Sequence, residues 1–492
     1  MAAIANYLAF DLGASSGRAV LGMFDGEKVK LEEVHRFENG PVRVLDHLHW
    51  DVLGLFEEIK TGLAKCATRQ NRLDGIGIDT WGVDFGLLSA SGELLGMPYH
   101  YRDGRTRGMF EEAFRRVPRE DIYAQTGIAF MELNTLYQLL ALSMRSGELL
   151  RSAERLLFMP DLLNYWLTGV MQSEYSIAST SQLYDTVRGQ WAEGLMGKLG
   201  LPVDIMPMVS NPGTIVANLL PGVANETGLA PTVVIAPACH DTGSAVAAVP
   251  AHGEGWAYIS SGTWSLVGCE IPEPIRTPDA LAENFTNEGG VSKTVRFLKN
   301  VAGLWLVQEC QRTWESQGES ISHEKLAQMA AASATGACFV DPDDARFADP
   351  GDMPKRIREY CAASGQPVPQ GKGEVVRCAL ESLALKYRMN LTELGRITGR
   401  PIAVVHVVGG GVRNEVLCQL TADVTGKPVV AGPAEATAIG NLMVQALARG
   451  HVSSLDEVRQ VVARSSELRH YEPAGTGTWD EAYRRFEVLC AS

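Results

Sequence analysis

LAFDLGASSGRAVLG, residues 8–22, consists of an apolar segment, a turn of small and hydroxyl residues, and a second apolar segment. The stretch AYISSGTWSLVG, residues 257–268, repeats this order about half a chain later. Recurrence over such a distance favours a duplicated lobe over a short-period solenoid. Two unrelated hairpins are the alternative, because Gly and Ser are common in any tight turn.

Short apolar runs and longer amphipathic stretches alternate on both sides of these two segments. Strands are expected at residues 7–12, 19–24, 75–79, 232–237, 256–260 and 403–408. Helices are expected at residues 52–68, 134–146, 374–395, 413–424 and 435–449. The alternation predicts an α/β fold with mixed sheets.

The length and the charge of the chain limit its architecture and its partners. A chain of 492 residues exceeds what one hydrophobic core usually supports, so two or three domains are expected. The small, Pro- and Gly-rich stretch at residues 245–255 suits a boundary. The formal charge of −14 argues against nucleic acid or an anionic membrane as partners. Local donors must therefore hold any phosphate ligand.

Targeting signals are not evident in the sequence. The first residues lack a basic region, and Asp11 interrupts the apolar run, so we expect a first strand rather than a signal peptide. No uninterrupted apolar run reaches 18 residues, which argues against a membrane span. These features predict a cytoplasmic protein.

The nine cysteines include no C-x-x-C pair. This pattern argues against a disulfide scaffold and against a zinc site, and it fits reduced thiols in the cytoplasm. Cys361 and Cys378 flank a Gly- and Pro-containing stretch and could meet at the base of a loop. Free thiols are the expected state there as well.

The first turn, residues 13–17, has the composition of an anion site. Its glycines allow backbone N–H groups to converge on a phosphate, its serines add hydroxyl donors, and Arg18 adds a charge-assisted donor. Asp11, at the end of the preceding strand, is a candidate to hold Mg²⁺ through water. The second turn, residues 260–263, offers similar hydroxyl and amide donors.

The same residues 13–17 also match G-x-S-x-G, the nucleophile elbow of serine hydrolases. That elbow leads into a helix, whereas the sequence here continues as a returning strand. A hydrolase would also need a separated acid and histidine, but His240 and Asp241 are sequence neighbours. A P-loop is absent, because no G-x-x-x-x-G-K-[ST] occurs.

Three further segments carry polar groups suited to a sugar and a nucleotide. In VVIAPACHDTGSA, residues 233–245, Asp241 follows a buried strand, where it suits either a base for phosphoryl transfer or a helix N-cap. In VVHVVGGGVRNEVL, residues 404–417, three glycines separate a strand from a helix and allow a base or ribose to approach the backbone. Residues 79–85 and 99–106 combine aromatic rings, carboxylates and guanidinium groups, as sugar sites do.

Together these motifs resemble those of the FGGY carbohydrate kinases, members of the actin/Hsp70/hexokinase superfamily, over roughly residues 6–470. The matching stretches are DLGASSGR at 11–18, GIDTWGVDF at 77–85, YRDGRT at 101–106, NTLYQL at 134–139, HDT at 240–242, SSGTWSL at 260–266, TNEGG at 286–290, KNVAGLWLVQ at 299–308 and HVVGGG at 406–411. So many separated matches in one order make a chance resemblance very improbable. Residues 186–230 show little resemblance.

The resemblance implies two ribonuclease-H-like lobes, residues 1–246 and 247–492, with ATP in the cleft between them. Within it Asp241 matches the catalytic base. The nucleotide-binding positions matched are Ala14, Ser15, Ser16, Gly17, Arg18, Thr263, Gln308 and Gly410. The sugar-contacting positions matched are Gly82, His240, Thr242 and Asn300.

The resemblance also implies the reaction and its cofactors. ATP, with Mg²⁺, would transfer its γ-phosphoryl group to the hydroxyl of a small ketose. His240 before Asp241, with the GTWSL and NVAGLWLVQ stretches, favours the 1-hydroxyl of L-rhamnulose. L-Fuculose or another ketose is the alternative acceptor, and a non-catalytic sugar sensor or ATP-dependent scaffold is the alternative outside the enzymes.

Overall fold

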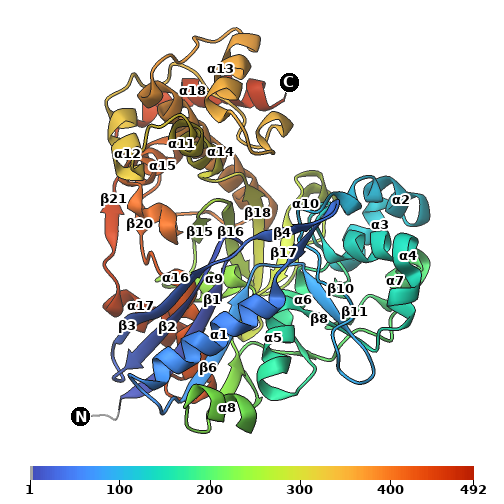
Figure 1. Ribbon diagram of the computed structural model, residues 1–492. Helices are drawn as coiled ribbons and strands as arrows, with labels where there is room; N and C mark the ends of the chain where they lie inside the picture. Colours follow the sequence, from blue (N-terminus) through green and yellow to red (C-terminus); the bar gives the residue numbers. More distant parts are fainter. Residues whose placement is uncertain (1–3, 492) are drawn as a thin grey trace. The chain divides into compact units, whose positions relative to one another are not determined.

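The computed structural model describes residues 4–491, which form an α/β fold around two large sheets (Figure 1). The chain divides into two compact units. The first unit comprises Met1–Ala248, Glu270–Phe297 and Ala436–Ser465. The second unit comprises Val249–Cys269, Leu298–Glu435 and Ser466–Ser492. Each unit carries part of the motifs described above, so each is described by itself.

The first unit is built on a six-stranded sheet with the order β13-β14-β6-β1-β2-β3. Its strands are β1 (Ala5–Leu12), β2 (Ser16–Phe24), β3 (Val29–Glu38), β6 (Gly75–Thr80), β13 (Thr214–Asn218) and β14 (Val233–Ala236). Strand β1 pairs antiparallel with β2 and parallel with β6, and β14 pairs parallel with β6. The carboxyl ends of β1, β6 and β14 therefore lie at one edge of the sheet.

Apolar side chains explain why β1 lies in the middle of this sheet. Six of its eight residues are buried, as expected for a strand that is covered on both faces. Helix α1 (Val52–Ala67) presents Leu55, Ile59 and Leu63, spaced four residues apart, to the same core as Phe10 of β1. Asp51 caps this helix by accepting a hydrogen bond from the Gly54 amide.

The first unit contains several further elements around this sheet (Figure 1). Its other helices are α2 (Met109–Arg116), α3 (Arg119–Thr126), α4 (Thr135–Arg151), α5 (Met159–Thr168), α6 (Tyr175–Ser179), α7 (Glu193–Leu199), α8 (Pro221–Thr227), α9 (Asp241–Ala247), α10 (Pro278–Ala282), α16 (Ala436–Ala448) and α17 (Leu455–Ser465). Its short strands are β4 (Pro41–Val44), β5 (His47–Trp50), β7 (Phe85–Leu88), β8 (Arg155–Phe158), β9 (Ser173–Glu174), β10 (Tyr184–Asp185), β11 (Gln190–Trp191), β12 (Val209–Ser210) and β17 (Thr286–Gly289).

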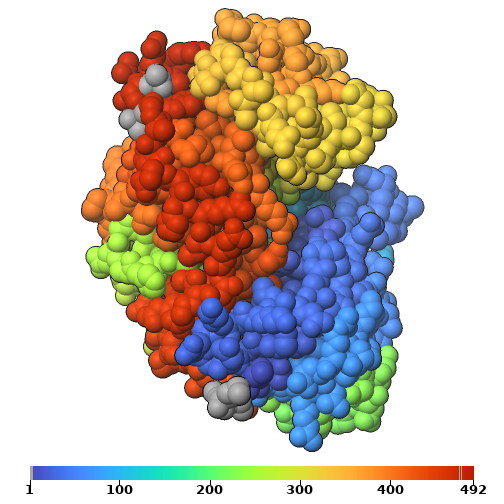
Figure 2. Space-filling view, turned by 90° about the vertical axis from the view of Figure 1, so that its left-hand side faces the viewer, coloured from blue at the N-terminus to red at the C-terminus, as the bar shows by residue number. Residues whose placement is uncertain are grey.

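Helices α16 and α17 lie more than 400 residues after β1 and β2, yet they belong to the first unit. A Cβ atom on Gly440 of α16 would lie 1.8 Å from the Ser244 carbonyl oxygen of α9, so only glycine permits this packing. The Ser465 hydroxyl of α17 accepts a hydrogen bond from the Val29 amide of β3. Figure 2 shows the red segment that contains α17 against the blue β2–β3 hairpin.

The chain therefore passes between the two units several times and does not divide at a single boundary. The first break, between Ala248 and Val249, lies two residues after the expected boundary at 246 and 247. Residues 270–297 and 436–465 then group with the first unit, although they follow that boundary in sequence. The assignment of residues 1–246 and 247–492 to two lobes stays a prediction.

The second unit repeats the strand order of the first. Its sheet contains β18-β16-β15-β19-β20-β21 as successive neighbours. These strands are β15 (Trp256–Ser261), β16 (Ser265–Ile271), β18 (Val295–Val301), β19 (Val404–Val408), β20 (Val429–Ala431) and β21 (Arg469–Tyr471). Strand β15 pairs antiparallel with β16 and parallel with β19, as β1 does with β2 and β6. The predicted duplication is thus confirmed as two hairpins in equivalent positions of two sheets.

Besides its sheet, the second unit consists mainly of helices. They are α11 (Trp305–Ser316), α12 (His323–Ala331), α13 (Met353–Ala363), α14 (Lys372–Thr398), α15 (Glu415–Thr425) and α18 (Thr476–Cys490). Single-turn 3₁₀ helices η1 (Gly104–Thr106), η2 (Val291–Lys293), η3 (Ala345–Phe347) and η4 (Gly410–Arg413) complete the two units. All six expected strands and all five expected helices are present, with ends that differ by a few residues. Within residues 4–491, no helix combines the length and the apolar character that a membrane crossing needs.

Candidate active site

The first turn, residues 13–17, joins β1 to β2 as a tight hairpin. The Gly13 amide donates to the Ser16 carbonyl oxygen over 2.9 Å. Ser15 is exposed, and Ala14 and Ser16 are half-buried, so the hydroxyls and amides of the turn lie at the surface. Because β2 follows the turn directly, the strand–turn–helix geometry of a hydrolase elbow does not occur here.

Charged and polar side chains brace this turn. Asp11 and Arg18 are paired across the hairpin, and the guanidinium donates from Nε (3.0 Å) and Nη2 (2.7 Å) to Asp11 Oδ2. Asn39 donates two hydrogen bonds to the turn: its Nδ2 to the Gly13 carbonyl oxygen over 2.8 Å, and its backbone amide to the Ser15 carbonyl oxygen over 3.2 Å. A Cβ atom on Gly17 would lie 2.3 Å from the Phe37 ring, which explains the glycine there.

Asp79 lies beside Asp11, where β6 runs parallel to β1. Its side chain is fully buried, and Asn441 Nδ2 donates to its Oδ2 over 2.5 Å. Within residues 4–491, its Oδ1 has no hydrogen-bond partner. Burial raises the pKa of Asp79 well above its ordinary value, and the nearby carboxylates of Asp11 and Asp241 raise it further. Carboxylates gathered in this way fit a hard divalent cation.

Asp241 is the first residue of α9, and His240 occupies the N-cap position. The alternative that Asp241 is merely the N-cap is therefore wrong. Its Oδ1 accepts hydrogen bonds from the Thr242 amide (2.5 Å) and the Thr242 hydroxyl (3.1 Å). The Asp241 side chain is 30% exposed, so its carboxylate is oriented by its neighbour and still accessible to a ligand.

His240 connects Asp241 to a buried ion pair. Its Nε2 lies 3.4 Å from Asp241 Oδ1, and its Nδ1 lies 3.2 Å from Glu288 Oε2 and 3.1 Å from Arg296 Nη2. Arg296 is fully buried and its Nη1 lies 3.1 Å from Glu288 Oε2. Burial by itself would raise the pKa of Glu288, but Arg296 and then His240 hold it below its ordinary value. The charged network fixes the imidazole ring beside Asp241.

The backbone before His240 is held as firmly as its ring. The buried Glu174 accepts a hydrogen bond from the Cys239 amide over 2.9 Å, and the Ser176 hydroxyl accepts one from the His240 amide over 3.0 Å. The Thr80 amide at the end of β6 donates to the Cys239 carbonyl oxygen over 2.9 Å. Asp241 therefore starts α9 from a fixed point at the carboxyl edge of the sheet.

Gly82 lies next to a strained residue. Val83 has φ +71°, an unfavourable conformation for a β-branched residue. Two threonines hold it there: the Val83 amide donates to the Thr180 hydroxyl over 3.2 Å, and the Thr135 hydroxyl donates to the Val83 carbonyl oxygen over 2.7 Å. A Cβ atom on Gly82 would lie 3.3 Å from the Thr180 side chain. The strain indicates a backbone shaped for a ligand rather than for stability alone.

Asp84 organises the aromatic residues near this segment. Its Oδ2 accepts hydrogen bonds from Trp50 Nε1 (2.6 Å), Trp81 Nε1 (3.1 Å) and the Tyr101 amide (3.1 Å). The Trp50 and Trp81 rings stack at 3.9 Å, and Trp81 is only 6% exposed. Burial raises the pKa of Asp84 to about 6. Asp84 and Trp81 are thus buried residues that support the backbone at Gly82 and Val83.

The second turn, residues 260–263, lies where β15 leads into β16 in the second unit. Hydrogen bonds between uncharged groups support this turn. The Thr263 hydroxyl donates to Gln308 Oε1 over 2.9 Å, and the Leu304 amide donates to the Gly262 carbonyl oxygen over 3.0 Å. Gly303 has φ +53°, and a Cβ atom there would lie 2.5 Å from the Thr263 carbonyl oxygen. The segment that begins α11 is therefore packed directly against the turn.

The three glycines after β19 have different roles. A Cβ atom on Gly409 would lie 3.0 Å from the Ser261 carbonyl oxygen, and one on Gly411 would lie 2.0 Å from Ser261 Oγ. A Cβ atom on Gly410 would have no neighbour within 4 Å among residues 4–491. Gly410 thus presents open backbone at the start of η4, as expected for a nucleotide platform. Asn300 is half-buried in β18 of the same unit.

The structure thus collects the predicted residues into two groups, one in each unit. The first unit holds Asp11, Ala14, Ser15, Ser16, Gly17, Arg18, Gly82, His240, Asp241 and Thr242. The second unit holds Thr263, Asn300, Gln308 and Gly410. Four supporting residues were not predicted from the sequence: Glu174, Glu288, Arg296 and Gly303. The TNEGG and NVAGLWLVQ motifs contained the signal for Glu288 and Gly303.

Comparisons with known proteins agree with this arrangement. The profile of the FGGY family of carbohydrate kinases, N-terminal domain, matches residues 6–248, and that of the C-terminal domain matches residues 257–449. The chain is 46% identical to a rhamnulokinase from Bacteroides thetaiotaomicron, covering 98% of this chain and 99% of the relative. It is 42% identical to a rhamnulokinase from Pectobacterium atrosepticum, covering 99% and 97% of the two chains.

Solved structures share the fold at low sequence identity. A ligand-bound xylulose kinase from Lactobacillus acidophilus is 15% identical, has a TM-score of 0.82, and is matched over 99% of this chain and 98% of that chain. A xylulose kinase from Rhodospirillum rubrum is 19% identical, has a TM-score of 0.79, and is matched over the same shares. These likenesses confirm the predicted two-lobed, actin-like ATPase fold. By its sequence over nearly its whole length, this chain belongs to the FGGY family of carbohydrate kinases.

Proposed function

We propose that the protein transfers the γ-phosphoryl group of ATP to the 1-hydroxyl of L-rhamnulose, giving L-rhamnulose 1-phosphate and ADP. The observation that carries this proposal is the full-length similarity, 41–46% identity, to proteins named rhamnulokinase. The accessible carboxylate of Asp241, fixed beside His240, supports it from the structure. Retention of this carboxylate argues against a non-catalytic sugar sensor or scaffold.

Asp241 is the proposed catalytic base. As the 1-hydroxyl oxygen attacks the γ-phosphorus, its proton passes to the Asp241 carboxylate, and the bond from that phosphorus to the bridging oxygen of ADP breaks. The Thr242 amide and hydroxyl already hold Asp241 Oδ1, which leaves Oδ2 for the substrate proton. Positioning and charge stabilisation supply most of the rate, because phosphoryl transfer asks little covalent chemistry of the protein.

The two turns are the proposed phosphate contacts. Ala14, Ser15, Ser16 and Gly17 offer amides and hydroxyls, and Arg18 offers a charged donor. In the second unit the Thr263 hydroxyl, with Gln308 behind it, offers a neutral donor. The open backbone at Gly410 is the proposed adenosine contact. Preorganised donors of this kind stabilise the charge that develops on the transferred group.

The carboxylates at the edge of the first sheet fit Mg²⁺. We propose that Asp11 holds the ion through water, with Asp79 close by. Two observations support this fit: the buried Asp79 Oδ1 has no hydrogen-bond partner among residues 4–491, and the pKa of Asp79 is raised by burial first and then by the nearby Asp11 and Asp241. When bound, the ion supplies positive charge at the β- and γ-phosphate oxygens.

Gly82, His240, Thr242 and Asn300 are the proposed sugar contacts. The strained backbone at Val83 shapes the first of them, and the Glu288–Arg296 pair orients the second. We also place the protein in the cytoplasm, where its nine free thiols would stay reduced. A small ketose and ATP are the proposed partners.

The test of this proposal is ADP release with L-rhamnulose, L-fuculose, D-xylulose and glycerol as separate acceptors. We expect the highest kcat/KM with L-rhamnulose and little ADP release without a sugar. A higher kcat/KM with L-fuculose or D-xylulose would overturn the acceptor and leave the kinase activity in place. Turnover on none of the four would favour the scaffold.

A further inference from the structure

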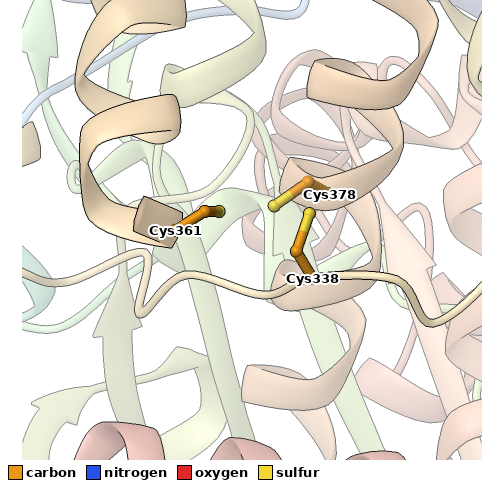
Figure 3. A group of neighbouring side chains, drawn as sticks. All are labelled: Cys338, Cys361 and Cys378. Atoms are coloured by element: carbon orange, nitrogen blue, oxygen red, sulfur yellow. The ribbon is translucent and has the colours of Figure 1, made fainter. Parts of the chain in front are cut away.

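Three buried cysteines from separate elements meet in the second unit. Cys338 lies in the extended segment before α13, Cys361 lies near the end of α13, and Cys378 lies in α14. Their Sγ atoms all lie within 4.8 Å of one another. Figure 3 shows the three side chains pointing toward a common point. The predicted meeting of Cys361 and Cys378 thus includes a third thiol that the sequence did not indicate.

Hydrogen bonds tie the three cysteine-bearing segments together. The Gln366 side chain accepts from the Phe339 amide (2.9 Å) and donates to the Phe339 carbonyl oxygen (2.8 Å). The Gln366 amide in turn donates to the Cys361 carbonyl oxygen over 2.9 Å. Gln366 therefore connects the Cys338 segment to the end of α13.

Ser382 connects the Cys338 segment to α14 in the same way. Its hydroxyl accepts from the Val340 amide over 2.9 Å and donates to the Cys378 carbonyl oxygen over 2.6 Å. The two connections fix all three backbones independently of the thiols. Outer hydrogen bonds of this kind preorganise the ligands of metal sites.

The composition and burial of the cluster limit which ion it suits. The three cysteines are 4%, 0% and 2% exposed, in the order Cys338, Cys361, Cys378. Within residues 4–491, the group contains no His, Asp or Glu as a fourth ligand. Zinc takes four ligands, either all from protein or three with a bound water, and this buried group offers neither. Soft thiolates with three-fold coordination suit a soft monovalent ion.

We propose that Cys338, Cys361 and Cys378 form a site that binds one Cu⁺ ion through three thiolates. Binding releases the thiol protons to solvent and leaves negative charge in the site. Arg485 lies beside the cluster, where its Nη1 donates to the Gly336 carbonyl oxygen over 3.1 Å and its guanidinium lies 5.0 Å from the Phe339 ring centre. Its positive charge offsets part of the thiolate charge.

The experiment is an anaerobic titration of the reduced, full-length protein with Cu⁺ in competition with a Cu⁺ chelator. We expect one tightly held equivalent per chain, and X-ray absorption of the loaded protein should show sulfur ligands alone. Cys338→Ala, Cys361→Ala and Cys378→Ala should each weaken binding by more than about 100-fold, the upper end of the cost of losing an outer partner. Cys418→Ala is the matched control, because Cys418 is equally buried but lies outside the group.

Several results would overturn the proposal. Nitrogen or oxygen ligands in the X-ray absorption of the unaltered protein would do so without any variant. Affinity that survives all three substitutions, or that falls as much in Cys418→Ala, would place the ion elsewhere. A disulfide between two of the three thiols that persists in reductant would leave too few thiolates. The sugar kinase activity is not the readout, so failure here is distinct from failure of the proposed function.

Discussion

The turns at residues 13–17 and 260–263 occupy equivalent places in two sheets of the same strand order, yet they are supported by different chemistry. An ion pair, Arg18 with Asp11, braces the first turn, and the buried Asp79 lies next to it. A neutral hydrogen bond, from Thr263 to Gln308, and the close packing of Gly303 brace the second.

This difference indicates that the two copies of the motif have different roles. We infer that the first turn responds to the charge of the phosphates, to the metal ion and to pH. The second turn supplies uncharged donors, whose interaction with a ligand should depend on their position and not on salt or pH. Substitutions in the first turn should therefore change salt and pH dependence, whereas those in the second should not.

Among the substitutions at the two turns, the largest effect on the KM for ATP is expected from Gly303→Ala, beside the second turn. Its left-handed φ and the 2.5 Å approach to the Thr263 carbonyl oxygen leave no space for a methyl group. Strain of about 1–3 kcal/mol, added to the displacement of the turn, should raise the KM for ATP by about 100-fold. The KM for the sugar should change much less. Steady-state kinetics with each substrate varied would measure both constants.

Gly318→Ala is the matched control for this substitution. Gly318 has φ +88°, but a Cβ atom there would have no neighbour within 4 Å in the described part of the chain. It therefore imposes the backbone penalty without the clash. Equal values of the KM for ATP in the two variants would show that Gly303 does not support the turn.

The next effect is expected from Arg18→Ala in the first turn. Loss of a charge-assisted hydrogen bond of about 1.5–3 kcal/mol should raise the KM for ATP by about 10- to 100-fold and weaken its dependence on salt. KM values for ATP at low and high ionic strength would measure this. Arg36→Ala is the matched control, because it removes an exposed arginine that lies opposite Arg18 in the pairing of β2 with β3. An equal rise in the KM for ATP there would show that Arg18 has no specific role in the first turn.

A smaller effect is expected from Thr263→Val. It removes the hydroxyl that donates to Gln308, worth about 1 kcal/mol, and should raise the KM for ATP by about fivefold with unchanged salt dependence. Thr263→Ser keeps the hydroxyl and should behave as the unaltered protein does. If the Ser variant were as weak as the Val variant, the methyl group rather than the hydrogen bond would matter.

The last prediction concerns the free energy of unfolding rather than the KM for ATP, and its variant is Asp79→Asn. The pKa of Asp79 is raised in the folded state, so its contribution to the free energy of unfolding is present below about pH 4 and is lost as pH rises through the folded-state pKa. The Asn variant lacks this loss, and Asn441 can still donate to its amide oxygen. Its stability relative to the unaltered protein should therefore increase with pH, as denaturant unfolding from pH 4 to 8 would show. A constant difference would contradict the pKa direction.

The strands, turns and helices could be predicted from the sequence because each depends mainly on residues close together in the chain. Apolar runs at residues 7–12 and 256–260, each followed by a turn that contains glycine, led to the correct hairpins, since strand and turn propensities depend on near neighbours. It did not predict that α16 packs on β1 and α9. The apolar face of a helix does not tell which sheet covers it, and the glycine at 440 gained its meaning only from Ser244.

The site was predicted in part for the same reason. Motifs pointed to His240 and Asp241, but the buried pair of Glu288 and Arg296 behind them depends on contacts about 50 residues away. The strain at Val83 was also invisible, because a valine with positive φ has no sequence signal. Cys338 likewise joined its two partners only through the fold.

Asp241→Asn tests most directly whether Asp241 acts as the base of an L-rhamnulose kinase. ATP binding, measured by calorimetry, should stay close to that of the unaltered protein, because the turns are untouched. The kcat of L-rhamnulose-dependent ADP release should fall by about 10²–10⁴-fold or more, the usual contribution of a positioned base. A variant that keeps a near-normal kcat would show that Asp241 is not the catalytic base.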